Sequence, residues 1–516
     1  MAGAANLYRQ ALAQAPDKKT MIYIVADGLR DCGFWAEGLA ILQQGSQRWP
    51  QNIGMLSRLS QAYFERGDYK EAANCLDRFL ERVPGELGHW QQLGELRMRS
   101  GEFEKAERAF DRILSIDPLN VVASVGRGDA LWQQHRIGES VEAYRRAIAI
   151  EPENANGLFK IGLALFHTGS AMEAGHFLQR SLQINPHNIP AYGHLSLALS
   201  ATGQFGTAAD IARVAVEADA NAGLANYALG KALIGLGDFD NAAESLKRAS
   251  DAAPRDKEVL LALADAETSR DQPFGAERAL QQLLALEPSD TSARFMLAAL
   301  HGEALQTPPP DFAREAFDRI ALSYDAVFGA AHAYRTPVDA ALLLEDTFPD
   351  QSTFKKFADL GCGTGLTAFA MRDAFRIEHA TGIDVSARMI EQATPKELYD
   401  RLMLGDATET LGALKEQFDL VTAIEILPYV GDLSAMVRSV AASLARNGLF
   451  ICSIERSDQP PYALRRTRRF AHDVAYLKDL AQAAGLQFVA SRPSPTPRYL
   501  GTQSEGELLL FRGTAS

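Results

Sequence analysis

The sequence predicts a multidomain protein in which an all-α solenoid precedes an α/β domain with a mostly parallel, seven-stranded sheet. Two observations predict this fold class. A 34-residue period runs through the first 290 residues, and short apolar runs then alternate with amphipathic helical segments. At 516 residues the chain is also too long for one hydrophobic core. We expect repeats over 1–290, a closing helix and proline-rich linker over 291–310, and the α/β domain over 311–516.

The composition is that of an ordinary globular protein, with 47% hydrophobic and 23% charged residues and no apolar run long enough to span a membrane. The net charge of −13 argues against a nucleic-acid-binding protein, which usually presents a basic face. The first residues lack the basic and apolar regions of a secretory signal. Four scattered cysteines show neither a CxxC pair nor metal-ligand spacing. We therefore expect a cytoplasmic protein with no metal site.

Three positions in each 34-residue unit mark the period. Prolines stand at 16, 50, 84, 118, 152, 186, 254 and 288, and Ala220 fills the one missing place. Seventeen residues earlier the chain has Gly33, Gly67, Gly101, His135, Gly169, Gly203, Gly237 and Asp271. Twelve residues earlier it has Gly38, Ala72, Ala106, Ser140, Ala174, Ala208, Ala242 and Ala276. A glycine suits a turn between two helices, a small residue lets them cross closely, and a proline ends the second helix.

This pattern resembles the tetratricopeptide repeat (TPR), a two-helix unit whose copies stack into a solenoid with a concave groove. Residues 3–16 fit the second helix of an incomplete first unit, and 291–302 fit a closing helix. The resemblance implies a protein or peptide partner in the groove. The groove positions carried over from the family are Gln91, Glu95, Asp129, Trp132, Phe159, Phe166, His167, Tyr227 and Lys231. The alternative is that many of these side chains pack between helices or face water.

The pattern changes after QTPPPD, where consecutive prolines favour an extended spacer. A helical segment over Phe312–Phe348 comes next. Seven apolar runs then predict strands: FADLG, HATGID, RLMLGD, FDLVTAIEIL, GLFICSIE, LQFVAS and ELLLFRG. The last two runs have no helical pattern between them, so we expect them to form an antiparallel hairpin at one edge of the sheet.

The first of these runs leads into a turn, DLGCGTG, with glycines at alternate positions. The dinucleotide fingerprint GxGxxG is not complete, because Leu366 occupies its last position. A phosphate-binding P-loop is excluded because no lysine follows. Acidic residues at the ends of the next two strands, Asp384 and Asp406, strengthen the indication of a nucleotide site, although each could instead be a helix N-cap.

In this order and spacing, the motifs resemble those of class I methyltransferases, which use S-adenosylmethionine (SAM). The resemblance implies a Rossmann-like fold in which the glycine turn lies beneath the methionine part of SAM. It also implies that Asp384 accepts the ribose hydroxyls and that Asp406 accepts the adenine amino group. The cofactor-binding residues implied for the turn and the strand ends are Asp359, Gly361, Cys362, Gly363, Thr364, Gly365, Asp384, Val385, Ser386, Asp406, Ala407 and Ile424.

The whole chain is similar to bacterial TPR-repeat methyltransferases, with repeats fused to a C-terminal methyltransferase domain. This likeness is carried by segments 317–337, 427–433 and 468–485 and by the final GELLLF. By analogy, 317–337 forms a lid in which Tyr324, Tyr334 and Arg335 close over SAM. This resemblance implies the cofactor and the fold but does not identify the methyl acceptor.

The catalytic candidates are Glu425, Tyr429 and His472, which could contact the acceptor or carry its proton. Each could equally be structural, as a helix cap, a core tyrosine or a surface histidine. The (Asp/Asn/Ser)-Pro-Pro-aromatic box of amide and exocyclic-nitrogen methyltransferases is absent. The basic run Arg465–Arg469 is either a solvated loop or a guide for an anionic acceptor such as a carboxylate or phosphate.

Three functions fit these observations. The first is a SAM-dependent methyltransferase whose acceptor, a protein or peptide, is recruited through the TPR groove. The second is a methyltransferase for a small molecule or lipid precursor, with repeats used for assembly. The third is a TPR adaptor that keeps a SAM-binding fold without turnover, which the intact glycine turn and both acidic residues argue against.

Overall fold

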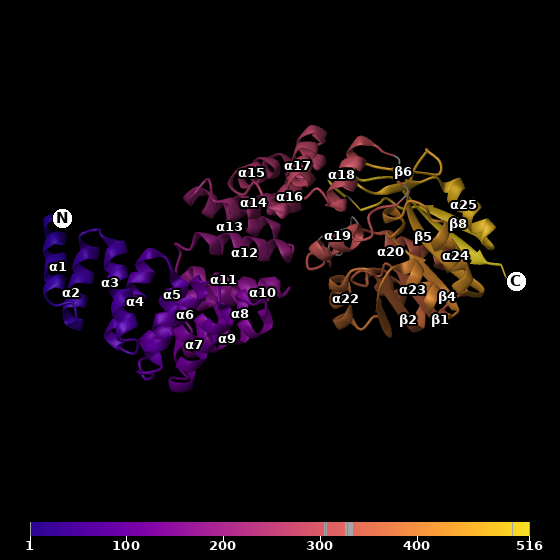
Figure 1. The fold of residues 1–516 in the computed structure, drawn as a ribbon. Helices are drawn as coiled ribbons and strands as arrows, with labels where there is room; N and C mark the ends of the chain where they lie inside the picture. The colour runs from indigo at the N-terminus through magenta and orange to yellow at the C-terminus, as the bar shows by residue number, and fades with distance from the viewer. Residues whose placement is uncertain are drawn as a thin grey trace. The chain divides into compact units, whose positions relative to one another are not determined.

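The computed structural model describes residues 2–303, 305, 307–325, 328, 334–497 and 499–514. The described residues form an array of helices followed by an α/β domain, as the sequence predicts (Figure 1). The chain divides into two compact units, Met1–His187 and Asn188–Ser516. The last helical repeats therefore belong to the same unit as the α/β domain. The domain boundaries expected from the sequence remain a prediction.

The first unit consists of helices that pair in the order of the sequence. Their bounds are α1 (Ala2–Gln14), α2 (Lys19–Asp31), α3 (Trp35–Arg48), α4 (Ile53–Arg66), α5 (Tyr69–Leu80), α6 (Leu87–Arg99), α7 (Phe103–Ile116), α8 (Val121–Gln133), α9 (Ile137–Ile150), α10 (Ala155–His167) and α11 (Ala171–Ile184). The N-terminal helix α1 stands where the incomplete first repeat is expected.

The second unit begins with helices of the same kind and continues with two that lead into the sheet (Figure 1). The repeat helices are α12 (Ile189–Ala201), α13 (Phe205–Ala218), α14 (Gly223–Leu236), α15 (Phe239–Ala252), α16 (Lys257–Ser269), α17 (Pro273–Leu286) and the closing helix α18 (Thr291–His301). The two helices before the first strand are α19 (Phe312–Ile320) and α20 (Thr336–Thr347).

The turn position of each repeat has a left-handed backbone. The six glycines there have φ between +75° and +87°. His135 and Asp271, which replace glycine, adopt φ of +59° and +56°. The small residues expected at the helix crossings are buried in both units. These two features confirm the physical interpretation of the repeat pattern.

The α/β domain is built on one mixed sheet. Its strands are β1 (Thr353–Leu360), β2 (Arg376–Asp384), β3 (Arg401–Leu404), β4 (Phe418–Ala423), β5 (Leu444–Arg456), β6 (Tyr462–Leu464), β7 (Phe470–His472), β8 (Leu486–Pro493) and β9 (Gly506–Gly513). The parallel strands run in the order β3-β2-β1-β4-β5, and β9 pairs antiparallel with β5 and β8. The antiparallel hairpin of the last two predicted strands is therefore confirmed.

The seven-stranded prediction needs one correction. All seven predicted strands are present, but the short strands β6 and β7 add to the sheet beyond the end of β5. They span three residues each and flank the basic run, so no apolar alternation marked them in the sequence.

Helices cover the sheet and bury its apolar side chains. They are α20, α21 (Leu366–Ala374), α23 (Ala407–Ala413), α24 (Ser434–Ser443) and α25 (Val474–Ala483), while α22 (Ala387–Ala393) follows β2. Loops of two to five residues connect the ends of β1, β2 and β3 to the starts of α21, α22 and α23. The loops that carry the candidate residues therefore gather at the carboxyl ends of these strands.

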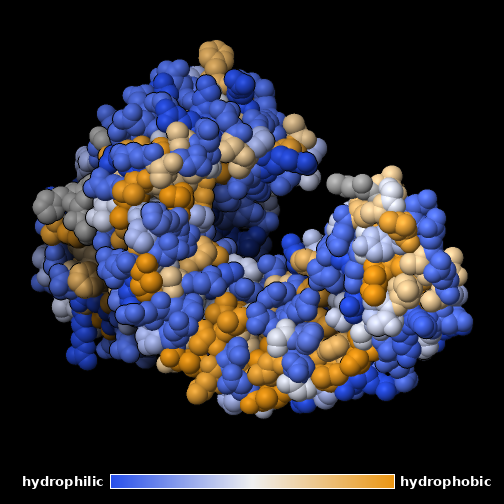
Figure 2. All heavy atoms as spheres, turned by 90° about the vertical axis from the view of Figure 1, so that its left-hand side faces the viewer, coloured by the Kyte–Doolittle hydropathy of each residue, from blue (hydrophilic) through white to orange (hydrophobic). Residues whose placement is uncertain are grey.

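The face of the molecule in Figure 2 is largely hydrophilic, with hydrophobic side chains in patches between polar ones. Among exposed hydrophobic side chains, Met172 is 80% and Phe274 is 84% accessible. Within the described ranges, we find no helix with both the length and the apolar character needed to cross a membrane.

Candidate functional site

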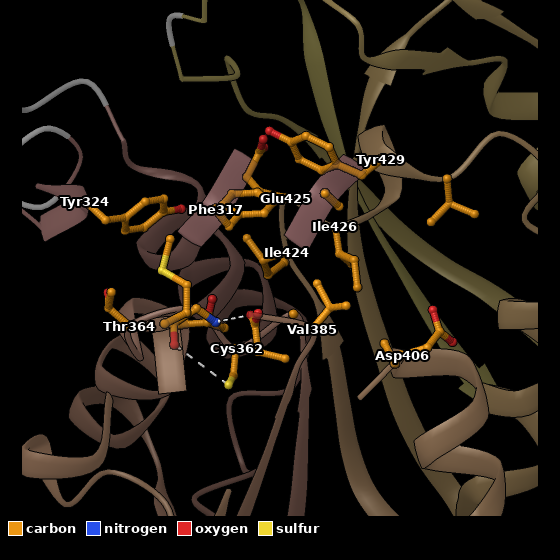
Figure 3. Close-up of a pocket in the computed structure, with 18 of the residues that line it drawn as sticks. Phe317, Tyr324, Cys362, Thr364, Val385, Asp406, Ile424, Glu425, Ile426 and Tyr429 are labelled. Atoms are coloured by element: carbon orange, nitrogen blue, oxygen red, sulfur yellow. Dashed lines mark hydrogen bonds between the residues drawn. The ribbon is translucent and has the colours of Figure 1, made fainter. Parts of the chain in front are cut away.

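A cavity of about 270 Å³ lies where β1, β2 and β4 end and α23 begins. We call it the first cavity (Figure 3). It lies within the second unit, and the ends of several strands meet around it. Its lining includes Pro308–Pro310, Phe317, Tyr324, Tyr334, Gly361–Thr364, Asp384, Val385, Asp406, Ala407 and Ile424–Ile426, together with Tyr429.

The glycine turn between β1 and α21 forms one wall of this cavity. Gly361, Gly363 and Gly365 have φ of +65°, +52° and +98°, which residues with a side chain adopt only at a cost. A Cβ atom at Gly363 would meet no atom within 4 Å, because the space beside this residue is open. The turn thus exposes backbone to a ligand. Gly365 lies outside the lining and caps α21 instead.

Asp384, at the end of β2, is fixed by backbone amides on both sides. Its Oδ2 accepts a hydrogen bond from the Gly363 amide at 2.8 Å, and its Oδ1 accepts one from the Ser386 amide at 2.8 Å. Burial raises the pKa of Asp384, and these amide donors oppose that rise. Ser386 caps α22 and donates to Asp318 Oδ1 at 2.6 Å. The carboxylate is therefore held in one orientation beside the glycine turn.

Asp359 lies behind the cavity and is not part of its lining. Its carboxylate accepts hydrogen bonds from Thr422 Oγ1 at 2.6 Å and Tyr399 Oη at 2.7 Å. Burial raises the pKa of Asp359 to about 6. These contacts join β1 to β4 and to the segment before β3, so Asp359 supports the turn from beneath.

Asp406 is both an N-cap and a lining residue. Its Oδ1 accepts hydrogen bonds from the Thr408 and Glu409 amides at 2.9 and 3.0 Å. Its Oδ2 has no hydrogen-bond partner among the described residues and is available to a ligand. The N-cap alternative and the ligand-binding expectation are therefore compatible. Val385, Ala407 and Ile424 contribute apolar surface to the same lining.

Glu425 and Tyr429 lie together at another part of the lining, after β4 (Figure 3). Arg469 links them, because its Nη2 donates to Glu425 Oε2 at 2.6 Å and its Nη1 to Tyr429 Oη at 3.5 Å. The Arg469 side chain is 3% exposed, and its guanidinium also pairs with Glu455. Glu425 has a left-handed backbone, with φ of +59°. Strain of this kind often accompanies functional positions.

The helix that precedes the sheet contributes aromatic side chains to the lining. Phe317, on α19, packs edge-to-face against Tyr429 with ring centroids 5.0 Å apart, and against Tyr324 at 6.5 Å. Burial raises the pKa of Tyr324, Tyr334 and Tyr429. The phenols are therefore neutral at physiological pH.

The structure describes Arg335 but only part of the predicted lid. Arg335 is outside the lining; its side chain is 65% exposed and its guanidinium pairs with Asp339 at 3.4 Å. Within the predicted lid 317–337, residues 326, 327 and 329–333 lie outside the described residues. The lid itself remains a prediction.

His472 is buried on β7, away from the lining. Its Nε2 lies 2.9 Å from the Val430 carbonyl oxygen and 3.0 Å from that of Gly431. Burial lowers the pKa of His472 to about 4, so the ring is neutral at pH 7. The side chain fastens β7 to the loop that carries Tyr429.

Some lining residues were not identified from the sequence. Pro308–Pro310 were interpreted as a spacer, and Phe317 was part of the expected lid without an assigned role. The triple proline was the signal for the first, since a stiff segment can form a wall as well as a linker. In the described part of the chain, no three His, Cys, Asp or Glu side chains gather as they would around a metal ion.

Family models match both parts of the chain. A methyltransferase-domain model matches residues 358–450, which include the glycine turn, Asp384, Asp406 and Glu425. Tetratricopeptide-repeat models match residues 57–121, 128–169 and 233–300. The chain therefore carries tetratricopeptide repeats followed by a methyltransferase domain.

Curated relatives match part of the same domain. Over 112 residues the chain is 33% identical to a ubiquinone biosynthesis O-methyltransferase from Haemophilus ducreyi, covering 20% of this chain and 47% of that protein. Over 151 residues it is 28% identical to the Aeromonas salmonicida protein of the same name, covering 26% and 63%. The match thus spans less than two thirds of each relative.

The chain is also similar to solved structures, at a lower sequence identity than to the curated relatives. One is magnesium protoporphyrin IX methyltransferase from Synechocystis PCC 6803 with bound SAM, at 18% identity and a TM-score of 0.28. The likeness covers 38% of this chain and 84% of that one.

Proposed function

We propose that the chain is a class I methyltransferase that takes its methyl group from SAM and uses its last repeats in acceptor recruitment. The observation that carries the proposal is the first cavity. There the glycine turn, Asp384 and Asp406 converge at the carboxyl ends of parallel strands, the usual ligand site of open α/β sheets. The methyltransferase-domain match over the same residues supports it.

The residues of the first cavity fit SAM as a ligand. The open space beside Gly363 leaves room for the methionine part, and a carboxylate fixed like that of Asp384 suits two ribose hydroxyls. The unpartnered Oδ2 of Asp406 suits the adenine amino group, a hydrogen-bond donor. Val385, Ala407 and Ile424 offer apolar surface for the base. In this arrangement Tyr324 and Tyr334 would close the cavity over the ligand.

When bound, SAM would supply a methyl group on a positively charged sulfur, and the electrons of the broken carbon–sulfur bond would remain on that sulfur as a thioether. The chain has to align the acceptor atom and exclude water, which is worth roughly 7–11 kcal/mol in well-oriented systems. Phe317 and the tyrosines around it provide that exclusion. The acceptor's lone pair would form the new bond to carbon.

Glu425 is the group best placed to take the acceptor's proton. Its side chain is 9% exposed and lies in the lining, and its carboxylate accepts hydrogen bonds from Arg469 Nη2 at 2.6 Å and from Ser453 Oγ at 3.4 Å. Tyr429 would hold the acceptor beside it by a hydrogen bond from its neutral phenol. A dedicated base is required only where the acceptor must lose a proton.

Calorimetric titration of SAM into the full chain tests the proposal, with Asp384→Ala in parallel. Asp419→Ala is a matched control, because Asp419 Oδ2 also accepts two backbone amides, those of Lys355 and Lys356, both at 2.9 Å. Asp419 lies at the start of β4, the opposite end of the strands from the cavity. Both variants lose a carboxylate bonded to backbone, but only one borders the first cavity.

We expect micromolar SAM binding by the native chain and by Asp419→Ala, and a loss of binding in Asp384→Ala. Equal binding by all three proteins would place SAM elsewhere and refute the assignment of the first cavity. An absence of binding to the native chain would refute the enzyme function and favour an adaptor.

A further inference from the structure

A second cavity of about 100 Å³ adjoins the first within the same unit. Its lining comes from three parts of the chain that are distant in sequence. Repeat helices α14 and α16 contribute Tyr227, Lys231, Glu258 and Asp265, α19 contributes Phe317 and Arg319, and the α/β domain contributes Tyr429, Arg468 and Tyr499. Phe317 and Tyr429 line both cavities. A molecule that enters the first cavity beyond the methyl group would therefore extend toward the second.

Cations outnumber anions around the second cavity. Lys231, Arg319 and Arg468 face Glu258 and Asp265 there. Lys231 forms no hydrogen bond or ion pair with any residue that the structure describes, and burial lowers its pKa. An ammonium held this way is under-compensated, which favours an anionic ligand beside it.

Arg468 indicates more specifically than Lys231 which kind of anion the second cavity would bind. Its side chain is 6% exposed, and its Nη1 donates to Asp265 Oδ1 at 2.6 Å. Its Nε and Nη2 are buried and have no hydrogen-bond partner among the described residues. These two nitrogens form one edge of the guanidinium fork, whose spacing matches the two oxygens of a carboxylate. Arg468 also has a left-handed backbone, with φ of +66°, which costs conformational energy. A role of Arg468 in ligand binding would explain why this strain is kept.

The rest of the lining suits a compact organic group. Leu261, Ala262, Phe312 and Ile320 provide apolar surface. Burial raises the pKa of Tyr227 and Tyr499, so both phenols are neutral hydrogen-bond donors. The carboxylates of Glu258 and Asp265 would repel a dianion more strongly than a monoanion. Together these features favour a carboxylate over a phosphate.

We propose that the second cavity binds the carboxylate of a small organic acid that is the methyl acceptor, with Lys231 and the free edge of Arg468 as its ligands. This inference rests on the proposed methyltransferase function. The acid would place its carboxylate against the repeat helices and its nucleophilic atom in the first cavity beside Glu425. The last repeats are then part of the acceptor site as well as a surface for partners.

Benzoate is the probe for this site, with benzamide as its uncharged counterpart and phenyl phosphate as the alternative anion. Binding to the full chain is measured by saturation-transfer NMR and calorimetry, with and without SAM. Lys231 forms no hydrogen bond or ion pair with the described residues, so Lys231→Met breaks no such contact and should fold normally. Lys247→Met makes the same substitution on an exposed face of α15 and serves as control. Arg468→Lys keeps the charge but removes the fork.

We expect benzoate to bind at least tenfold more tightly than benzamide, and Lys231→Met to lose at least fivefold of that affinity. Arg468→Lys should also weaken benzoate binding, while Lys247→Met should not. SAM affinity should be unchanged in Lys231→Met and Lys247→Met. This pattern would separate ligand binding from a structural role, because a variant that merely unfolds loses SAM as well.

Equal binding of benzoate and benzamide would overturn the proposal, as would a Lys231→Met variant with native benzoate affinity. Tighter binding of phenyl phosphate than of benzoate would overturn the carboxylate assignment. If the native chain binds benzoate but not SAM, the proposed function fails and the acceptor role fails with it. If SAM binds and benzoate does not, only the present inference fails.

Discussion

The two cavities are adjacent but are built in different ways. The first is bordered by a turn and strand ends within residues 361–436, together with the segment before β1. The second takes its charges from α14, α16, α19 and the basic run, and one contact there, between Arg468 and Asp265, joins residues 203 positions apart in the sequence. A cofactor common to many enzymes can be held by a local motif on one sheet. Under the proposed function, the acceptor would be held by side chains that the last repeats bring to the same place as the α/β domain.

Of the substitutions that distinguish the two cavities, Gly363→Val is expected to have the largest effect, which is on SAM affinity. A side chain at Gly363 would fill the open space of the first cavity, so SAM affinity should fall by about 100-fold or more. Gly67→Val is the matched control in the first unit, since Gly67 also has a positive φ and a Cβ atom there would likewise meet nothing within 4 Å. Both variants carry a backbone strain of about 1–2 kcal/mol. Calorimetry of SAM binding and thermal unfolding measure the two effects separately.

Similar SAM affinities in Gly363→Val and Gly67→Val would contradict this prediction. Such a result would mean that SAM does not bind beside the glycine turn, so the first cavity would not be the SAM site.

Removing the charge of Asp265 tests how the second cavity is held together. Asp265→Asn leaves Arg468 buried without its anionic partner, which should lower the free energy of unfolding by about 2 kcal/mol. Asp271→Asn removes the partner of Arg466, in an ion pair whose side chains are 57% and 87% exposed. That control should change stability by no more than about 0.5 kcal/mol. Thermal unfolding monitored by circular dichroism distinguishes them, and equal shifts would show that the Arg468 pair is not structurally important.

The repeats could be predicted closely from the sequence because their interactions are local. The turn residues, the crossing residues and the closing helix α18 all occupy the expected places. The existence of the seven main strands and the final hairpin could also be predicted, since an apolar run in the sequence marks each strand, but the order of the strands within the sheet was not predicted. The short strands β6 and β7 could not, because three residues give too little alternation to detect.

The site could be predicted only where it follows a motif. Asp384 and Asp406 stand beside the first cavity as expected, but Phe317 and Pro308–Pro310 had no marker of their own. The basic run illustrates the physical limit. Its expected states were a solvated loop or an anion guide, yet Arg469 is buried against Glu425, 44 residues away. A charge pattern in sequence does not reveal a partner that only the tertiary fold supplies.

The pH dependence of stability should reflect Asp359, which supports the first cavity from behind. Its pKa is raised to about 6 in the folded chain, above the ordinary aspartate value. The folded state therefore binds the proton more tightly, and the stabilisation this gives is present at pH 4 and is lost as the pH rises through 6. A rise of about two pKa units corresponds to roughly 3 kcal/mol in the free energy of unfolding, which is an upper limit for the contribution of this one buried group. Asp359→Asn should lack this dependence.

Thermal midpoints of the native chain and Asp359→Asn, recorded from pH 4 to 7, check this expectation. The native chain should lose stability relative to the variant as the pH increases. Asp350→Asn, an exposed substitution before β1, controls for the loss of a carboxylate. A constant difference between native chain and Asp359→Asn across the range would show that Asp359 is ionised throughout.

The smallest predicted effect comes from Asp406, where a structural and a ligand-binding role share one carboxylate. Asn is as good an N-cap as Asp, so Asp406→Asn should keep the stability of α23. In this variant an amide nitrogen replaces one of the two carboxylate oxygens, and the negative charge is lost. SAM affinity should fall about fivefold, near 1 kcal/mol, because the adenine amino group loses a charged acceptor. Asp406→Ala should lose about 1 kcal/mol of stability in addition, since the Thr408 and Glu409 amides lose their partner. Comparing SAM affinity and thermal midpoint in the two variants therefore separates the roles. A loss of affinity in the alanine variant alone would mean that Asp406 acts on the cofactor only by holding the start of α23 in place.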